Sequence, residues 1–531
     1  ATVFLYKNNM SSLNRELGRS IAVLPFENMT EQPGSDYFSD GITEDIISAL
    51  SEINGLRVIA RTSILQYKGT NKTVVEIAKE VNVNTILEGS VRRIDNNVRV
   101  VAQLIDIETD DHLWANTYDR KLDDIFEVQS DIALNIANAL EAELSTELTA
   151  ELTSSSTQNS QAYENYLKGK EQYYTYTEEG FRKAVKYYNS ALELDPNYAL
   201  AYAELAGAYA QMYNTTKDEL FNDLGHKAVE KALALDNNLA QAYKARAVLA
   251  LYNDKYTESL QDNLKAIELI PGYADAIGNV ASRYFDFGDL SEFYRWRTKH
   301  YSLSPNSRYA SWKFSMSHYL LGETEKAIRI TNEGIEKIED SYECRSLLFH
   351  YHINSHEFEK AKNILNELEK VRNSDNRTNG LWALYYLMLG DFETAVDKAL
   401  NTPNLDEYGQ LYLAHIYAEV GNWAKVNQML SIVEKVNTQK LQEGSEGYKA
   451  YYILSQVQSI LGNNDSALVL LEDALNNGFR GISDDVNFLS WLVNPIFSDL
   501  RQNSRFIMLQ KRMEKIIQRE RVEAGFLNQA S

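Results

Sequence analysis

Two groups of side chains have residue types and spacings suited to metal or proton chemistry. The first is His352 and His356, four residues apart, the spacing of two zinc ligands on one helix face. The nearby His350 is not an evident third ligand, and His356 stands where related segments carry a glycine that would end a helix. We therefore interpret these histidines as cations at a helix C-terminus, stabilised by the helix dipole, and expect no bound metal.

The second group consists of carboxylates. Asp36, Asp40 and Glu44 would share one face of a helix, and Asp45 is adjacent. Paired carboxylates could hold a cation or act as general acid and base. The simpler interpretation, which we favour, is acidic residues at a helix N-terminus, where the dipole stabilises negative charge.

No motif for covalent or phosphate chemistry accompanies these groups. The chain has no G-x-S-x-G, no P-loop and no G-x-G-x-x-G, and its only cysteine is Cys344. One thiol forms neither an internal disulfide nor a cysteine-based metal site. The sequence therefore predicts no catalytic residue and no cofactor, and the chain is not expected to be an enzyme.

The charge balance argues against nucleic acid as a partner. The chain of 531 residues has 53 Lys and Arg against 75 Asp and Glu, a net charge of −22. Binding to phosphates needs a surplus of Lys and Arg. Direct nucleic-acid binding is therefore not expected.

The first residues are apolar but few. Val3, Phe4, Leu5 and Tyr6 precede Lys7, whereas a membrane-spanning helix needs about 20 apolar residues. We interpret residues 1–19 as the end of a membrane anchor and a tether, with the anchor helix outside this chain. The alternative is the frayed terminus of a soluble protein.

Residues 20–146 alternate between strand and helix patterns. Short apolar runs and near-alternation predict strands, and apolar spacing on one face predicts helices. The predicted order is β-α-β-α-β-β-β-α, an α/β domain with a mixed sheet. Strands are expected at 21–26, 56–60, 85–93, 98–107 and 113–118, and helices at 35–51, 74–81 and 122–144.

Several strings in this region resemble the TolB N-terminal-like (FlgO-like) domain of bacterial signalling proteins. They include Ser20-Ile-Ala-Val-Leu-Pro-Phe-Glu-Asn-Met, Asp36-Tyr-Phe-Ser-Asp-Gly-Ile-Thr-Glu-Asp-Ile-Ile, Leu87-Glu-Gly-Ser-Val-Arg-Arg and His112-Leu-Trp-Ala. In that family the domain commonly lies between one transmembrane helix and tetratricopeptide repeats. Upstream of the helix is a cytoplasmic output domain, either DNA-binding or a class III nucleotide cyclase. The resemblance thus implies a periplasmic sensor half whose output domain is absent here, and a homodimer if that output is a cyclase.

A period of 34 residues organises the rest of the chain. Gly288, Gly322, His356 and Gly390 mark it, and Ala327, Ala361 and Ala395 follow the marks. Such a period predicts helix–turn–helix units that bury their apolar faces by stacking on one another. The units resemble tetratricopeptide repeats and predict an all-α superhelix.

The predicted boundaries follow from these patterns. A linker is expected at 147–160, about nine helix pairs at 161–485 and cap helices at 486–531. Two early units are lengthened, one by a loop at 174–180 and one by an insertion at 214–220.

Candidate partner-binding residues come from both regions. On the concave face of the repeats they are Tyr202, Tyr243, Arg345 and Gln410; in the stretches that resemble the family they are Arg61, Trp114 and Arg120. Packing between helices is the favoured alternative for each tyrosine, and structural salt bridges for the arginines of the front domain.

The resulting prediction is a non-catalytic, membrane-anchored sensory region that binds a protein or peptide in the repeat groove. It would regulate an attached output domain. Two alternatives stay open: a stand-alone cytoplasmic scaffold of tetratricopeptide repeats, and an enzyme whose site has no recognisable motif.

Overall fold

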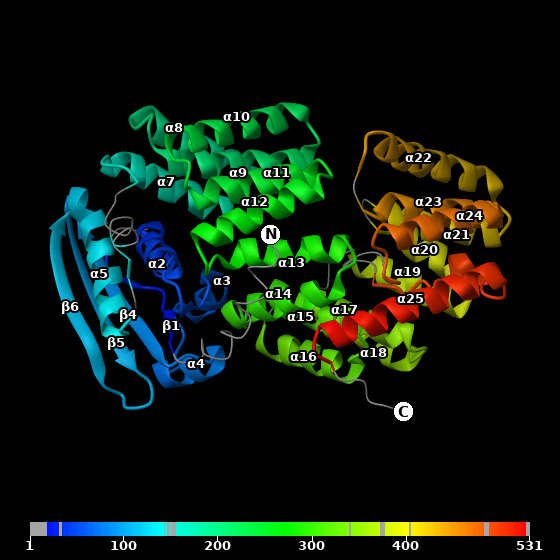
Figure 1. The fold of residues 1–531 in the computed structure, drawn as a ribbon, viewed down its shortest axis with the longest axis horizontal. Coiled ribbons are helices and arrows are strands. Elements are labelled where there is room, and N and C mark those ends of the chain that lie inside the picture. Colours follow the sequence, from blue (N-terminus) through cyan, green and yellow to red (C-terminus); the bar gives the residue numbers. More distant parts are fainter. Residues whose placement is uncertain are drawn as a thin grey trace. The chain divides into compact units, whose positions relative to one another are not determined.

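A computed structural model describes residues 19–30, 34–142, 144–145, 149, 156–338, 341–371, 377–402, 405–445, 447–482 and 488–526 (Figure 1). The predicted anchor and tether, and most of the predicted linker, lie outside these residues. The chain divides into two compact units. The first comprises Ala1–Val280 with Lys299–Asn306, and the second Ala281–Thr298 with Ser307–Ser531.

A small mixed sheet opens the first unit, as the strand patterns predict. Its strands are β1 (Ser20–Val23), β2 (Glu27–Asn28), β3 (Arg57–Val58), β4 (Thr85–Ile94), β5 (Asn97–Asp106) and β6 (His112–Lys121). They follow the order β3-β1-β4-β5-β6, and β2 pairs with β4. The pairs among β1 to β4 are parallel, whereas β4–β5 and β5–β6 are antiparallel. Strand β6 forms one edge of the sheet (Figure 1).

Helices cover both faces of this sheet unequally. Helices α2 (Asp36–Ser51) and α5 (Ile125–Ala139) pack on one face. On the other face, α3 (Arg61–Ile64) and α4 (Val74–Val81) cover β1 and the start of β4. The described residues also include the short 3₁₀ segments η3 (Leu65–Tyr67), η4 (Leu122–Asp124) and, in the second unit, η5 (Pro495–Leu500).

The helix expected at 122–144 is shorter than the apolar pattern suggests. Helix α5 ends at Ala139 because Glu141 takes a left-handed conformation, with φ of 52°. The amide of Ala142 then donates to the carbonyl of Ala137 over 2.9 Å, which closes the last turn. Strand β2 and helix α3 are elements that the sequence pattern did not reveal.

The remaining described helices follow one another in pairs. In the first unit they are α7 (Ser160–Tyr173), α8 (Glu178–Leu194), α9 (Ala199–Thr216), α10 (Glu219–Leu235), α11 (Ala240–Tyr252) and α12 (Tyr256–Leu269). Helix α13 (Ala274–Asp286) begins in the first unit and ends in the second, and α14 (Leu290–Leu303) begins in the second and ends in the first. The second unit continues with α15 (Arg308–Leu320), α16 (Thr324–Lys337), α17 (Tyr342–Asn354), α18 (Phe358–Val371), α19 (Arg377–Leu389), α20 (Phe392–Leu400), α21 (Glu407–Glu419), α22 (Trp423–Gln442), α23 (Lys449–Ile460), α24 (Asn464–Asn476) and α25 (Ser504–Glu523).

The 34-residue marks are the turns inside these pairs. Gly288, Gly322 and Gly390 have φ of 73°, 79° and 76°, and His356 has φ of 57°. In each case the next amide bonds back to the carbonyl five residues earlier, as Glu323 does to His318 over 2.9 Å. The small residues that follow, such as Ala327 and Ala361, are fully buried. The period therefore repeats a left-handed turn and a close helix contact.

The insertion at 214–220 differs from a loop. Helix α9 runs on to Thr216, where Lys217 at φ of 57° ends it, and α10 begins at Glu219. The extra residues are thus mostly an added helical turn. The other lengthened segment is a true loop, of residues 174–177 between α7 and α8.

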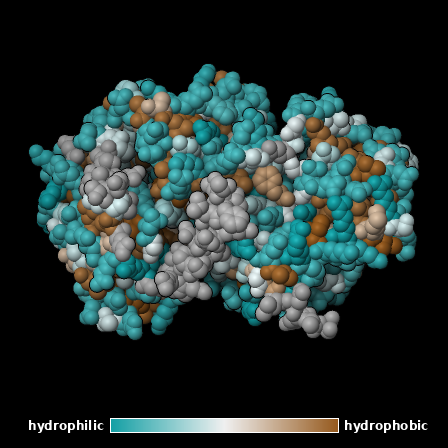
Figure 2. All heavy atoms as spheres, viewed as in Figure 1, coloured by the Kyte–Doolittle hydropathy of each residue, from teal (hydrophilic) through white to brown (hydrophobic). Residues whose placement is uncertain are grey.

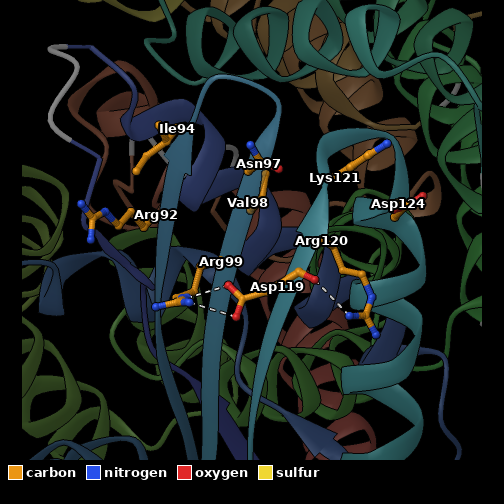
Figure 3. A pocket seen from close by; sticks show the side chains of 9 residues that line it. All are labelled: Arg92, Ile94, Asn97, Val98, Arg99, Asp119, Arg120, Lys121 and Asp124. Atoms are coloured by element: carbon orange, nitrogen blue, oxygen red, sulfur yellow. Dashed lines mark hydrogen bonds and ion pairs between the residues drawn. The ribbon is translucent and has the colours of Figure 1, made fainter.

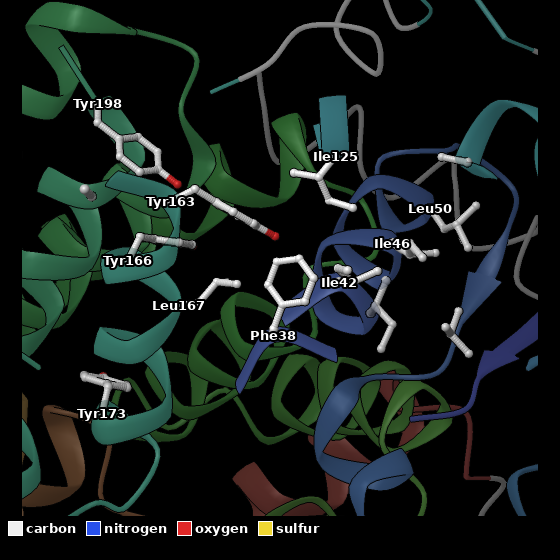
Figure 4. Close-up of a cluster of buried hydrophobic side chains, with 14 of the residues drawn as sticks. Phe38, Ile42, Ile46, Leu50, Ile125, Tyr163, Tyr166, Leu167, Tyr173 and Tyr198 are labelled. Carbon is white, nitrogen blue, oxygen red and sulfur yellow. The ribbon is translucent and has the colours of Figure 1, made fainter. Parts of the chain in front are cut away.

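One apolar core joins the sheet to the first helix pairs. Phe38 and Ile42 of α2 face Tyr163 and Leu167 of α7 (Figure 4). Gly41 allows this approach, because a Cβ at that position would come within 2.5 Å of Leu167. The α/β part and the first repeats therefore share a single interior. The face seen in Figure 2 is mostly hydrophilic, in keeping with the net charge of −22.

Candidate functional site

Glu44 is the centre of an ion cluster where α2 meets the repeat helices. Its carboxylate lies 2.8 Å from Lys170 Nζ and 3.2 Å from Arg61 Nε. The Tyr174 hydroxyl donates to the same carboxylate over 2.6 Å, and the Arg61 guanidinium lies 4.0 Å from the centre of the Tyr174 ring. Helix α2, helix α3 and the end of α7 thus meet at one carboxylate.

The elements explain this convergence. Ile42 belongs to the apolar stripe of α2 that packs on α7. Glu44, two residues later, lies at the rim of this helix contact. Lys170 is in the last turn of α7, and Arg61 is the first residue of α3. The side chains of Glu44, Arg61 and Lys170 remain 18%, 20% and 11% exposed, so solvent reaches the cluster.

The charges in the cluster compensate one another. Burial by itself would raise the pKa of Glu44, but the charges of Lys170 and Arg61 and the hydrogen bonds from Lys170 and Tyr174 outweigh it. The pKa of Glu44 therefore lies below its ordinary value. Burial also disfavours the charge on Lys170, yet its pKa is raised by Glu44, Glu204 and Asp45. The ion pair stays ionised at neutral pH.

Further charged groups continue from the cluster along the first helix of each pair. Glu204 of α9 and Lys244 of α11 are only partly buried, and Lys244 lies 3.7 Å from Asp275 at the start of α13. Burial raises the pKa of Glu204 against the opposing charges of Lys170 and Lys244. Among the described residues Glu204 makes no side-chain ion pair or hydrogen bond. We call Glu44, Arg61, Lys170, Glu204 and Lys244 the charged row.

A second carboxylate of α2 is tied to the repeats by neutral donors. Asp45 Oδ2 accepts from the Tyr163 hydroxyl and, over 2.9 Å, from Gln129 Nε2 of α5. Gln129 also donates to the Tyr163 oxygen over 2.9 Å. Burial raises the pKa of Asp45 to about 6 even though Lys170 and these hydrogen bonds lower it.

Aromatic residues border the charged row at the α7–α8 loop. Tyr173 and Tyr174 pack edge to face with ring centres 5.8 Å apart. Tyr176 is 65% exposed and has φ of 50°, an unfavourable conformation for an aromatic residue. An exposed ring held in this way near Lys244 and Arg61 suits contact with a ligand or partner.

The arrangement is suited to recognition of charged groups. Glu44, Arg61 and Lys170 are held in position by ion pairs and by the Tyr174 hydroxyl, and Lys244 lies near Asp275. The raised pKa of Asp45 would suit a general base, but its Oδ2 atom already accepts hydrogen bonds from Tyr163 and Gln129. A row that carries both positive and negative side chains fits a peptide or protein surface with complementary charges.

The structure locates the candidate residues of the first unit in different places. Arg61 belongs to the charged row. Tyr202 packs between neighbouring helices, and the Tyr243 hydroxyl donates to the carbonyl of Asn237 over 3.0 Å. Trp114 packs against the sheet core opposite Leu104. Arg120 lines a separate cavity at the end of β4, β5 and β6.

Two candidates lie in the second unit. Arg345 donates to the Ser341 hydroxyl at the start of α17, and Gln410 donates to the carbonyl of Leu405 over 3.1 Å at the start of α21. Both therefore have a local partner near a helix N-terminus.

The groups first considered for chemistry are engaged in internal contacts. His352 Nδ1 lies 2.7 Å from Glu357, and His350 Nδ1 lies 2.7 Å from the carbonyl of Ser346. Helix α17 ends at Asn354, before His356, as predicted. Asp36 and Asp40 both pair with Lys68. No group of three or more potential metal ligands occurs among the described residues.

Sequence reasoning missed most of the charged row. Glu204 and Lys244 each interrupt a stretch rich in alanine, leucine and tyrosine on a first helix, whereas Lys170 follows Lys168 and Gly169 in a polar segment. A charge within such a stretch is the signal that could have indicated them, because a buried helix position rarely carries one without a partner or a function. Glu44 was considered, but only with its neighbours on α2.

The comparisons with known proteins agree with a signalling context. No family model matches the chain. A protein from Rhizobium meliloti (strain 1021), described as putative adenylate cyclase 3, is 37% identical over 234 residues, which cover 43% of this chain and 40% of that protein. The chain therefore spans less than half the length of the curated relative it matches.

Several solved structures share the helical repeat at low similarity. The pilF protein of Pseudomonas aeruginosa is 17% identical, covers 43% of this chain and 96% of its own, and has a TM-score of 0.34. YrrB, described as a TPR protein with an unusual peptide-binding site, is 16% identical over 35% of this chain and 93% of its own, with a TM-score of 0.28. Human IFIT1 is 14% identical over 66% of this chain and 88% of its own, with a TM-score of 0.37. At such scores these likenesses do not bear on function.

In the part of the chain that the structure describes, every helix is too short or too polar to cross a membrane.

Proposed function

We propose that this chain is the non-catalytic sensory and protein-interaction region of a larger bacterial signalling protein. A partner binds along the charged row, and the output domain, a nucleotide cyclase or a DNA-binding domain, lies outside this chain. The similarity to part of a putative adenylate cyclase supports the signalling role. The resemblance of residues 20–146 to the TolB N-terminal-like domain supports a membrane-anchored, periplasmic location for this region.

The observation that carries the proposal is the position of Glu44. Its contacts to Lys170 and Tyr174 connect the α/β part to α7, and Glu204 and Lys244 lie on α9 and α11, the first helices of the next two pairs. A partner that pairs with Glu204 changes the electrostatic interaction between Glu204 and Lys170. Because Lys170 forms an ion pair with Glu44, the change also affects Glu44. Binding along the row is therefore coupled to the packing of α2 on α7. That coupling is a route by which a ligand could alter an attached domain.

The test is site-specific crosslinking followed by charge reversal. A photoreactive phenylalanine analogue at the exposed Tyr176 position should crosslink to a partner in an extract of the native envelope. Glu204→Lys together with Lys244→Glu reverses the row and should abolish that crosslink. Lys186→Glu, an exposed cation on α8, should leave it intact.

Two results would contradict the proposal. A crosslinked species that persists at full yield in the charge-reversed variant means that the row does not recognise the partner. Nucleotide-cyclase activity in the purified chain means that the region is catalytic.

A further inference from the structure

Three cross-strand rows of side chains lie on the face of β4, β5 and β6 away from α2 and α5. Val91, Val100 and Tyr118, which alternate with these rows, are buried on the helix side. The rows themselves are Ile94–Asn97–Lys121, Arg92–Arg99–Asp119 and Ser90–Val101–Thr117. We call these nine residues the open sheet face.

The middle row has an unbalanced charge. Arg92 stands directly opposite Arg99, and like charges in that relation destabilise a sheet. Asp119 neutralises Arg99 through two hydrogen bonds of 2.6 and 3.0 Å. Within the described residues Arg92 has no acidic partner. The row therefore lacks one carboxylate.

A cavity of about 600 Å³ lies at this end of the sheet (Figure 3). Arg92, Arg99, Arg120 and Lys121 line it, against only two acidic residues, Asp119 and Asp124. In Figure 3 Arg92 and Arg99 extend from adjacent strands, and Asp119 lies between Arg99 and Arg120. This concentration of cations is unusual for a chain with a net charge of −22.

Apolar side chains accompany the cations. Ile94 is 54% exposed and Val101 is 36% exposed, one on each side of the Arg92 row. An isolated ion would use only the cations, whereas a polypeptide segment could cover the apolar groups as well. The combination favours a peptide over a free anion.

We propose that the open sheet face binds an acidic segment of a partner protein. One carboxylate of the segment pairs with Arg92 in the fork geometry that guanidinium groups provide, and a second lies near Lys121. Apolar residues of the segment cover Ile94 and Val101. This surface is separate from the charged row. It gives the α/β part a second binding site, one for an acidic partner.

The first test measures binding of a fluorescein-labelled oligoglutamate peptide to the whole chain by fluorescence anisotropy, with an oligoglutamine peptide as the neutral comparison. We expect saturable binding of the acidic peptide only, weakening as salt is raised. Arg92→Gln should weaken it about fivefold, the loss expected for one ordinary hydrogen-bonded contact at an exposed surface. Lys186→Gln should have no effect.

The decisive variant is Arg92→Glu. It replaces the missing carboxylate within the chain and puts opposite charges across β4 and β5, so the variant should be at least as stable as the wild type. Its affinity for oligoglutamate should nevertheless fall at least about tenfold, because the added charge repels the peptide. Loss of binding therefore cannot be attributed to misfolding.

Other outcomes overturn the proposal. Equal affinity of the wild type and Arg92→Glu, or no binding of oligoglutamate, means that the face does not recognise carboxylates. Binding to phosphatidylserine vesicles without binding to the peptide assigns the face to a membrane. Concentration-dependent dimerisation that Arg92→Glu removes, without peptide binding, assigns it to a second copy of this chain.

Discussion

The Tyr163 hydroxyl donates a hydrogen bond to the carboxylate of Asp45, which lies 118 residues earlier in the chain. This bond crosses from a repeat helix to the α/β part. Together with Gln129 it surrounds the carboxylate with neutral donors, although burial raises its pKa to about 6. The contact between α2 and α7 should therefore depend on pH.

Replacing Asp45 by asparagine should remove that dependence. The unfolded chain releases the Asp45 proton near pH 3.9, whereas the folded protein holds it up to about pH 6. Folding thus takes up a proton between these values, so stability falls as pH rises from about 4 to 6 and is constant above. At about 1.4 kcal/mol per pH unit, the loss is at most about 3 kcal/mol.

Hydrogen–deuterium exchange of peptides from α2 and α7 measures this effect locally. The difference in protection between the wild-type protein and Asp45→Asn should change with pH between pH 4 and 6. At pH 7 the variant should be the more protected of the two. Identical pH profiles would show that Asp45 ionises normally.

Removing the charge of Lys170 should weaken the same contact. In Lys170→Met, Glu44 retains Arg61 but loses its nearest cation, and a half-satisfied carboxylate at a buried rim costs about 1–3 kcal/mol. Urea unfolding of Lys170→Met, of Glu44→Gln and of the double variant gives the coupling free energy between the Lys170 and Glu44 side chains. Lys183→Met, which breaks an exposed ion pair with Glu179, is the control and should leave the free energy of unfolding almost unchanged, because solvent screens such a pair. A coupling near zero would remove Glu44 as the link between the two parts.

His318 should make the second unit sensitive to acid. Its ring is buried against Tyr294 and Phe314, with ring centres 5.0 and 4.8 Å away, and neither nitrogen has a hydrogen-bond partner within the described residues. Burial, with a contribution from Lys326, lowers its pKa to about 3. Because the unfolded chain takes up the proton near pH 6.5, stability falls as pH drops from 6.5 towards 3.

His318→Phe should reduce this acid sensitivity, to which His350 and His415 also contribute, and raise stability at pH 7 by about 1 kcal/mol, since two unsatisfied nitrogens are removed. Thermal unfolding at pH 5 and pH 7 checks both effects. His226→Phe, at an exposed position on α10, is the control and should not alter the difference between the two pH values. An unchanged difference in His318→Phe would show that His318 is protonated in the folded protein.

His356→Gly should stabilise the third periodic turn. His356 is exposed and has φ of 57°, a conformation that costs a residue with a Cβ about 1–2 kcal/mol but costs glycine nothing. Greater freedom of glycine in the unfolded chain offsets part of this, so a net gain of about 0.5–1 kcal/mol is expected. Urea unfolding measures it, with Ser355→Gly, just before the turn, as the control. A loss of stability would mean that the ring contact of His356 with Phe358 outweighs the backbone effect.

The local pattern predicted the elements of this chain better than its site. The glycines at 34-residue intervals carry their own conformational requirement, so the turns could be predicted from residue type alone. The apolar faces of α2 and of the strands could be predicted from the spacing of apolar residues. Helix ends were harder to predict, because the early end of α5 depends on a hydrogen bond from the amide of Ala142 to the carbonyl of Ala137.

The contacts of the charged row could not be predicted because they join residues far apart in sequence. Tyr174 and Glu44 are separated by 130 residues, and no local pattern specifies that they meet. Arg61 was selected from the stretches that resemble a family, whereas Lys170, Glu204 and Lys244 were passed over as ordinary helix residues. The unbalanced Arg92–Arg99 pair likewise depends on strand register.

The most direct test of the account is the intact mass and membrane fractionation of the protein in its source cells. We predict a membrane-bound species well above the 60.6 kDa of this chain, carrying an output domain whose sequence identifies it as a cyclase or a DNA-binding domain. A soluble species of 60.6 kDa would contradict the sensory role and leave a stand-alone scaffold.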